Sequence, residues 1–338
     1  MKRLAVYFLL SLGVITVQSQ PKQDAYSLGV QGILKADNGD YKAGIKLLKR
    51  ARNLEPKEYD YAFEIGKAYL KSGKPRIAEK YFFELQYHSS VQADLYVLLS
   101  RCYEELEALK KNPNPENKKA MDVLRYGIQK LPKDGVLYLE LAQQNIKKEK
   151  FVEALVILES GIRSAPNFTE NYYWAAKLLM TSDNYLWTWL YSEICYNQTD
   201  DLDLKRSAAR IIEESTVHVF SESWQANPEK LDQNLRFIFS NKCKEHSDDV
   251  FDQQILIRSC LLENWDFTSS GINTLIDRLK FISAKGWNDA YVWSILQESN
   301  KEVFLKWIPE NGDMFDAYRN WSYWNPMLLK SPVNRLAN

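Results

Sequence analysis

The sequence predicts an all-α fold in which helical hairpins stack into a solenoid. Glycines recur at a spacing of 34 residues, from Gly32 to Gly66 and from Gly39 to Gly73. Apolar residues follow one another at mixed spacings of three and four, as on one face of an α-helix, and no segment alternates as a strand does. A fixed period of this length is typical of repeat proteins, in which each helical pair covers the apolar face of the pair before it.

Composition narrows the class of protein further. The chain has 338 residues, of which 45% are hydrophobic and 26% charged, so it has enough apolar material for a long helical array. Lys plus Arg total 44 and Asp plus Glu total 44, which gives a formal net charge of zero. Because no basic excess is present to attract phosphate backbones, we expect no nucleic-acid partner.

The N-terminus has the pattern of a secretory signal. Lys2 and Arg3 precede an unbroken apolar stretch over residues 4–17, and the small residue Ser19 follows. The stretch is shorter than the roughly 20 residues that a bilayer-spanning helix needs. We therefore expect a signal peptide over 1–19, cleavage after Ser19 and a short leader over 20–24. An uncleaved membrane anchor is the alternative.

The repeats themselves have small and large residues at fixed positions. In the first unit, which begins at about Ala25, the turn at Asn38-Gly39-Asp40 separates two helices. The positions expected at the close contacts of the first four units are Gly32, Gly44, Leu48 and Ala51, then Gly66, Ala78 and Phe82, then Tyr96, Leu99, Ala120, Leu124 and Gly127, then Tyr138, Ala154, Leu158 and Gly161. Pro56, Pro132 and Pro166 close three of the units. This pattern resembles the tetratricopeptide repeat (TPR), a helix-turn-helix unit with small residues at its packing points.

The resemblance covers residues 25–199, as about four good repeats and a degenerate fifth. An insertion near 106–117 contains Pro113 and Pro115, which cannot continue a helix, so we expect a protruding loop there. In the fifth unit, Trp187, Thr188 and Trp189 occupy the place of a regular second helix, and the resemblance fades. An ordinary helical bundle with coincidental spacing is the alternative fold.

The resemblance also implies a function and a site. Repeats of this family coil into a right-handed superhelix whose concave groove, lined by the first helix of each unit, receives a peptide or a partner helix. The matching groove candidates here are Tyr26, Asp60, Phe63, Lys67, Asp94, Arg101, Gln143, Tyr173 and Lys177. The alternative is that these residues form only a solvated inner face. Co-chaperone members clamp a partner's carboxylate with lysines and asparagines, and because the asparagines are missing here we expect no such clamp.

Residues 200–338 lack the repeat period but keep helical amphipathicity. We expect helices over 202–220, 228–242, 250–262 and 270–283, with Asn227 and the Ser247-Asp248-Asp249 turn as start signals. This region is rich in tryptophan, at Trp224, Trp265, Trp287, Trp293, Trp307, Trp321 and Trp324. Their irregular spacing favours packing between helices over a stacking platform for a sugar or peptide.

Motifs for catalysis or metal binding are missing from the sequence. It has no phosphate-binding glycine loop, no HExxH and no GxSxG, and its three histidines are His88, His218 and His246. Cys243 and His246 have the spacing of two metal ligands, but a second such pair is missing. The four cysteines, Cys102, Cys195, Cys243 and Cys260, permit two disulfides in an oxidising compartment, with the pairing open. We therefore expect no cofactor, no metal and no enzymatic activity.

Taken together, the sequence predicts an exported, non-catalytic scaffold of the cell envelope. It resembles the secreted TPR proteins of Gram-negative bacteria, which implies a periplasmic or outer-envelope location, a protein or peptide partner and peripheral association with the envelope. The alternative is a carbohydrate-binding or helical glycosidase-like exported protein that uses the tryptophan-rich C-terminal half.

Overall fold

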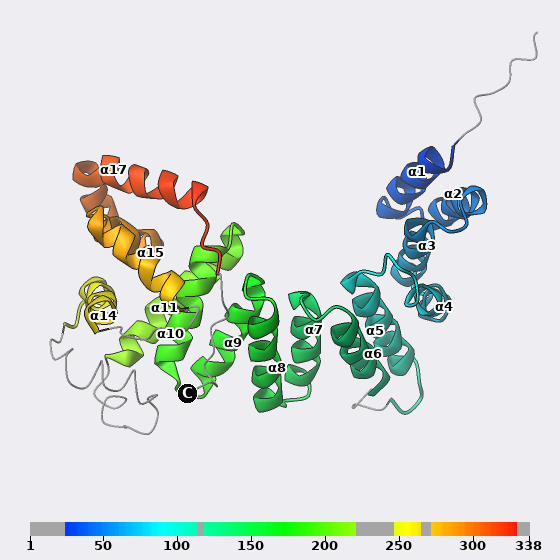
Figure 1. Ribbon diagram of the computed structural model, residues 1–338, viewed down its shortest axis with the longest axis horizontal. Coiled ribbons are helices and arrows are strands. Elements are labelled where there is room, and N and C mark those ends of the chain that lie inside the picture. The colour runs from blue at the N-terminus through cyan, green and yellow to red at the C-terminus, as the bar shows by residue number, and fades with distance from the viewer. Residues whose placement is uncertain (1–23, 114–117, 221–246, 265–271, 330–338) are drawn as a thin grey trace, which may run out of the picture. The chain divides into compact units, whose positions relative to one another are not determined.

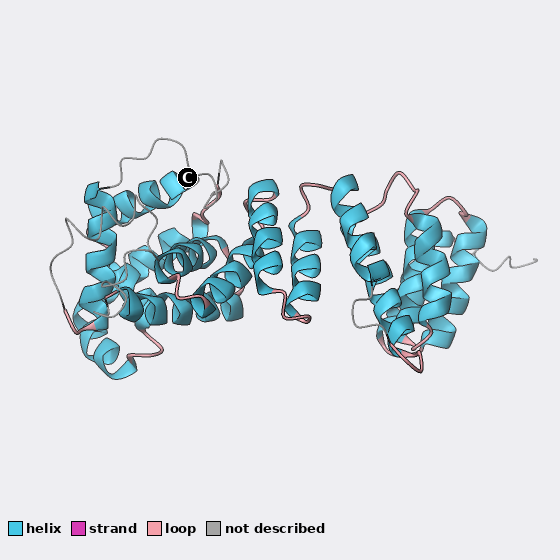
Figure 2. Cartoon of the chain, turned by 90° about the horizontal axis from the view of Figure 1, so that it is seen from below, coloured by secondary structure: helices cyan, strands magenta, loops and turns pink. Residues whose placement is uncertain are grey.

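The computed structural model describes residues 24–113, 118–220, 247–264 and 272–329, and all regular structure in these ranges is helical (Figures 1 and 2). The chain forms two compact units, unit 1 up to Ser90 and unit 2 from Val91 onward. The helices of unit 1 are α1 (Ala25–Asp37), α2 (Tyr41–Leu54), α3 (Tyr59–Lys71) and α4 (Pro75–Leu85). Those of unit 2 are α5 (Ala93–Ala108), α6 (Lys118–Lys130), α7 (Gly135–Ile146), α8 (Phe151–Ser164), α9 (Thr169–Thr181), α10 (Tyr185–Gln198), α11 (Leu202–Val219), α14 (Val250–Asn264), α15 (Ile272–Ala284), α16 (Asn288–Leu296) and α17 (Lys301–Trp324).

Unit 1 consists of two helical hairpins, α1–α2 and α3–α4. Within each hairpin, glycines allow the two helices to approach closely. A Cβ atom at Gly44 would lie 2.7 Å from the backbone oxygen of Gly32, and one at Gly66 would lie 2.6 Å from Cε1 of Phe82. Both distances are too short for any side chain, so the two helices of each hairpin touch through backbone or a packed ring. The prediction that small residues mark the packing points is confirmed.

The turns within hairpins share one geometry. After α1, the amide of Asp40 donates to the carbonyl of Lys35 at 2.9 Å, and Gly39 adopts a left-handed φ of 84°. The same bond joins Lys150 to Asn145 after α7, where Glu149 has a φ of 58°. This turn satisfies the last carbonyls of a helix while reversing the chain. It also follows α3, α9 and α15, so the turn between α15 and α16 is of the same kind although the sequence period has ended.

Unit 2 begins with three hairpins, α5–α6, α7–α8 and α9–α10, in which helices α5, α7 and α9 are neighbours. Glycine again meets tyrosine at the predicted positions: a Cβ at Gly127 would lie 2.8 Å from Cγ of Tyr96, and one at Gly161 would lie 2.7 Å from Cβ of Tyr138. The expected insertion lies between α5 and α6, and α5 continues to Ala108, slightly into that stretch. An all-α solenoid of stacked hairpins is the fold of the described chain.

Helix α10 explains why the fifth repeat is hard to recognise. All its residues from Leu186 to Gln198 are buried, because α9, α11 and the C-terminal helices surround it (Figure 1). An enclosed helix needs no polar face, and its apolar residues therefore show no helical period. The segment at Trp187 and Trp189 is a regular helix, although its sequence does not look like one.

The C-terminal helices confirm part of the prediction. Helices α11, α14 and α15 match the expected segments, and Asp249 caps α14 by accepting from the amide of Phe251 at 2.8 Å. The segment expected over 228–242, with its start signal at Asn227, lies outside the described residues. Helices α16 and α17 are not among the expected segments, and within α17 Pro309 and Gly312 interrupt the helical pattern.

Unit 2 continues across residues 199–200, where the repeat period ends. Helices α10 and α11 lie on either side of this point and pack against each other within one core. Residues on either side of 199/200 thus belong to the same compact unit. None of the described helices has the length and hydropathy of a membrane-spanning segment.

Candidate functional site

In unit 1 the predicted groove residues lie on α1 and α3. Tyr26 is 75% exposed on α1, and Asp60 is exposed at the start of α3. Phe63 is half-buried, stacked on Tyr59 at a centroid distance of 5.5 Å. Lys67 pairs with Glu64 at 2.6 Å, and its amine lies 5.9 Å from the Phe63 ring centroid. Phe63 and Lys67 thus already have partners within their own helix.

In unit 2 the predicted residues Asp94, Arg101, Gln143, Tyr173 and Lys177 lie on the neighbouring helices α5, α7 and α9. We call the exposed side of these three helices, which carries these residues, the first-helix face. Arg101 donates to Glu140 at 3.1 Å, and Lys147 donates to Glu104 at 3.1 Å, so two ion pairs join α5 to α7. These ion pairs link the exposed sides of the two helices, and one of them engages Arg101.

The part of the first-helix face on α9 carries an aromatic cluster. Tyr173 and Trp174 meet edge to face with centroids 5.9 Å apart, and both rings are half-buried. The exposed Lys177 places its amine 4.7 Å from the Trp174 centroid and 5.5 Å from that of Tyr173. Trp174 was missed from the sequence, although its position three residues before Lys177 puts both on one side of a helix. Together the three residues offer a rigid, amphipathic contact area.

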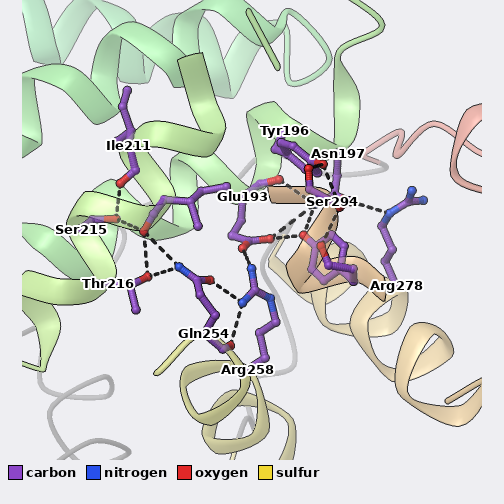
Figure 3. A network of polar contacts seen from close by, with 12 residues as sticks. Glu193, Tyr196, Asn197, Ile211, Ser215, Thr216, Gln254, Arg258, Arg278 and Ser294 are labelled. Carbon is purple, nitrogen blue, oxygen red and sulfur yellow. Dashed lines mark hydrogen bonds and ion pairs between the residues drawn. The ribbon is translucent and has the colours of Figure 1, made fainter. Parts of the chain in front are cut away.

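A second group that the sequence did not reveal is a buried polar network in unit 2 (Figure 3). At its centre the buried Glu193 of α10 accepts from Nη2 of Arg258 of α14 and from the hydroxyl of Tyr291 of α16. Asn197 donates to that hydroxyl at 2.7 Å, and Arg278 of α15 donates to Asn197 at 2.8 Å. Helices α10, α14 and α16 therefore meet at the Glu193 carboxylate, and α15 joins the network through Asn197.

Helix α11 joins the same network through Gln254 of α14. The Gln254 amide donates to Thr216 of α11 at 2.6 Å, and Arg258 donates back to the Gln254 carbonyl at 2.7 Å. Burial raises the pKa of the Glu193 carboxyl, and the positive charge of Arg258 opposes that rise. Because Glu193 is fully enclosed, we interpret this network as a structural clamp between α10 and the C-terminal helices.

A signal for this network does exist in the sequence. Glu193 is the one charged residue in α10, a segment rich in aromatic and aliphatic residues, and a buried charge needs a partner. The partners Arg258 and Tyr291 lie 65 and 98 residues away, so no local pattern identifies them.

The chain after α17 is tied to the repeat array. The amide of Met327 donates to the carbonyl of Asn197 at 3.0 Å, and the amide of Leu329 donates to the Asn167 side chain at 2.8 Å. Both Met327 and Leu329 are buried. Arg278 donates to the carbonyl of Asn325 at 2.6 Å, so a hydrogen bond connects the polar network to this segment.

The tryptophans behave mainly as the sequence predicts. Trp293 is buried, and Trp287, Trp307 and Trp321 are half-buried in ring contacts between helices α15, α16 and α17. Trp324 differs because it is 72% exposed. Trp224 and Trp265 lie outside the described residues.

The structure allows a check of part of the residues considered for metal binding and disulfide formation. Within the described ranges, no group of three or more His, Cys, Asp or Glu side chains has a metal-binding arrangement. Cys102 and Cys195 are buried and are not part of a disulfide, and burial raises the pKa of Cys195. Cys260, in contrast, is disulfide-bonded, so one of the two disulfides that the four cysteines permit is formed. Cys243 and His246 lie outside the described residues.

Comparison with known proteins gives only structural likenesses. No protein-family profile matches the sequence, and no curated protein matches it. The solved structures that it resembles include TTC0263, a thermophilic TPR protein of Thermus thermophilus, at 19% identity and a TM-score of 0.42, over 56% of this chain and 98% of that one. A MamA protein matches at 16% identity and a TM-score of 0.37, over 58% of this chain and 92% of that one. YrrB, a TPR protein with an unusual peptide-binding site, matches at 14% identity and a TM-score of 0.35, over 62% of this chain and 94% of that one. At these identities and TM-scores, the likeness to the solved structures is one of helical architecture and carries no functional information.

Proposed function

We propose that this protein is a non-catalytic scaffold that binds a partner protein through the first-helix face of unit 2. The observation that supports this function is the cluster of Tyr173, Trp174 and Lys177 on α9, next to the ion-paired surfaces of α5 and α7. Tyrosine and tryptophan are enriched among the residues that dominate binding energy at protein interfaces. Their rings are fixed here by the helix and by each other, so little conformational entropy is lost on binding.

Two ion pairs in the same face would fix the register of a partner. Arg101 with Glu140 and Lys147 with Glu104 offer both signs of charge beside the aromatic cluster. Such rim charges contribute more to specificity and association rate than to affinity. A partner helix or extended peptide with one apolar anchor and flanking charges of both signs matches this face.

A double variant tests the proposal. Tyr173→Ala/Lys177→Ala removes most of the cluster from the helix surface, whereas Val152→Ala/Val156→Ala alters exposed residues of α8 outside the first-helix face. In capture from an envelope fraction of the native host, we expect the first variant to lose the wild-type partner and the second to retain it. Equal capture by the two variants would contradict the proposal.

We also propose that the protein is exported and works in the periplasm or at the outer envelope. The support is the sequence pattern of Lys2, Arg3 and the apolar stretch over 4–17. N-terminal sequencing of the protein from native cells should begin at Gln20, with the protein in the envelope fraction. Retention of residues 1–19 would instead indicate an anchor.

Carbohydrate binding is a second candidate, favoured by one feature at the end of α17. Tyr323 and Trp324 are exposed and meet edge to face at 5.0 Å, and exposed rings of this kind can stack on sugars. Trp324→Ala would then abolish binding to envelope glycans and leave capture of the protein partner unchanged.

A further inference from the structure

Unit 2 contains a large cleft, and none of the residues of the α9 aromatic cluster lines it. Its volume is about 1070 Å³, and it lies between α11 on one side and α16 and α17 on the other. Pockets for small molecules typically measure about 300–1,000 Å³. The cleft therefore has room for a ligand larger than most metabolites.

Positive charge predominates in this cleft. The five cations that line it are Lys205, Arg206, Arg210, Lys301 and Arg319, whereas the acids are Asp200, Glu213 and Glu298. The balance is thus five against three, in a chain with zero net charge. Arg206 is paired with Asp203 and Glu298. Within the described ranges the other four cations make no ion pair, so their charges remain available to a ligand.

Lys205 is the most enclosed of these cations. It is half-buried on α11, and its amine lies 4.9 Å from the ring centroid of Tyr196. Burial lowers its pKa, and the neighbouring charges of Arg278 and Arg319 lower it further, while Asp200 opposes them. A positive charge that is poorly solvated and next to other cations is stabilised when an anion binds.

Apolar side chains lie among the charges. Leu202 of α11 is 67% exposed and Leu305 of α17 is 55% exposed, and both line the cleft with Phe304. Exposed leucines on opposite walls provide contacts for aliphatic side chains, which a sugar polymer does not have. Cations on both α11 and α17 suit a ligand whose negative charges are spread along its length.

We propose that this cleft binds an acidic polypeptide segment of a partner, in which aliphatic residues alternate with glutamate or aspartate. Lys205 would meet a carboxylate inside the cleft, and Arg210, Lys301 and Arg319 would meet others along its walls. Leu202 and Leu305 would contact the aliphatic side chains. This is a second binding site, separate from the first-helix face, and it does not depend on the function proposed for that face.

Fluorescence anisotropy tests the proposal with the full mature chain and a fluorescein-labelled twelve-residue peptide of alternating glutamate and leucine. We expect saturable binding that weakens as salt is added, and at least a tenfold preference over the same peptide with glutamine in place of glutamate. Arg210→Gln/Arg319→Gln should weaken binding at least about fivefold. Arg125→Gln, an exposed charge change on α6, should leave it unchanged.

Lys301→Glu provides a second variant, because reversing an exposed charge should weaken binding more than neutralising it. Far-UV circular dichroism establishes that each variant is folded. The proposal is wrong if the wild-type chain does not bind the glutamate peptide, binds the glutamine peptide equally well, or binds polygalacturonate but neither peptide. It is also wrong if the folded cleft variants bind as the wild type does. None of these results bears on capture through Tyr173 and Lys177.

Discussion

Replacing Glu193 with glutamine removes the negative charge that neutralises the buried Arg258 guanidinium between α10 and α14. Glutamine keeps the shape of the side chain and one acceptor oxygen, but its amide would face the Tyr291 hydroxyl. That hydroxyl now donates to Glu193 and accepts from Asn197, so it would lose its acceptor. The variant therefore leaves one unpaired charge and one unsatisfied proton in the core.

The free-energy cost of this substitution can be estimated from the burial of the ion pair. Glu193 has no exposed side-chain area, and Arg258 has only 7%. Removing one partner of a buried ion pair costs about 3–5 kcal/mol. For a unit of this size, that corresponds to a fall in melting temperature of roughly 6–20 °C. Replacing both partners, as in Glu193→Gln/Arg258→Met, should recover most of the loss because no charge is then left unpaired.

Tryptophan fluorescence measures this effect in unit 2 alone, because all ten tryptophans of the chain lie after residue 90. Urea unfolding of wild type, Glu193→Gln and the double variant gives the three free energies of unfolding. Arg206→Gln is the control, since its ion pairs are exposed and should contribute less than about 1 kcal/mol. A cost below about 1 kcal/mol for Glu193→Gln, or a double variant less stable than it, would refute the clamp.

The remaining predictions concern helix packing at glycines and backbone strain in a turn. Gly44→Ala places a Cβ 2.7 Å from the Gly32 carbonyl oxygen and should destabilise unit 1 by about 1–3 kcal/mol, measured by urea unfolding with tyrosine fluorescence and circular dichroism. Gly312→Ala in α17, where a Cβ meets nothing within 4 Å, should instead stabilise unit 2 by about 0.5–1 kcal/mol, and a loss of stability there would contradict the packing described. Glu149→Gly relieves a left-handed backbone at φ 58° and should raise the tryptophan-detected stability by about 1 kcal/mol; an unchanged midpoint would show that the turn is unstrained.

The sequence predicts the hairpins well because their contacts are local. Gly66 and Phe82, or Gly127 and Tyr96, belong to single helical pairs, and the same residue types recur in each repeat. Glu193 and its partners could not be found in this way, because Arg258 and Tyr291 approach it only after α14 and α16 have packed on α10. Helix α10 itself lacks a period because it is surrounded. Of the candidate surface residues, Tyr173 and Lys177 lie together on α9, whereas the sequence did not point to Trp174, whose ring lies under the same lysine.

Binding of a partner to the first-helix face is the central claim, and position-specific photo-crosslinking in the native host tests it directly. A benzophenone amino acid replaces Tyr173 of α9 in one strain and the exposed Val156 of α8 in another. We predict a discrete protein adduct at position 173 that is lost when Lys177→Ala is added, and no adduct at position 156. An adduct at position 156 alone, or equal adducts at both positions, would contradict the claim.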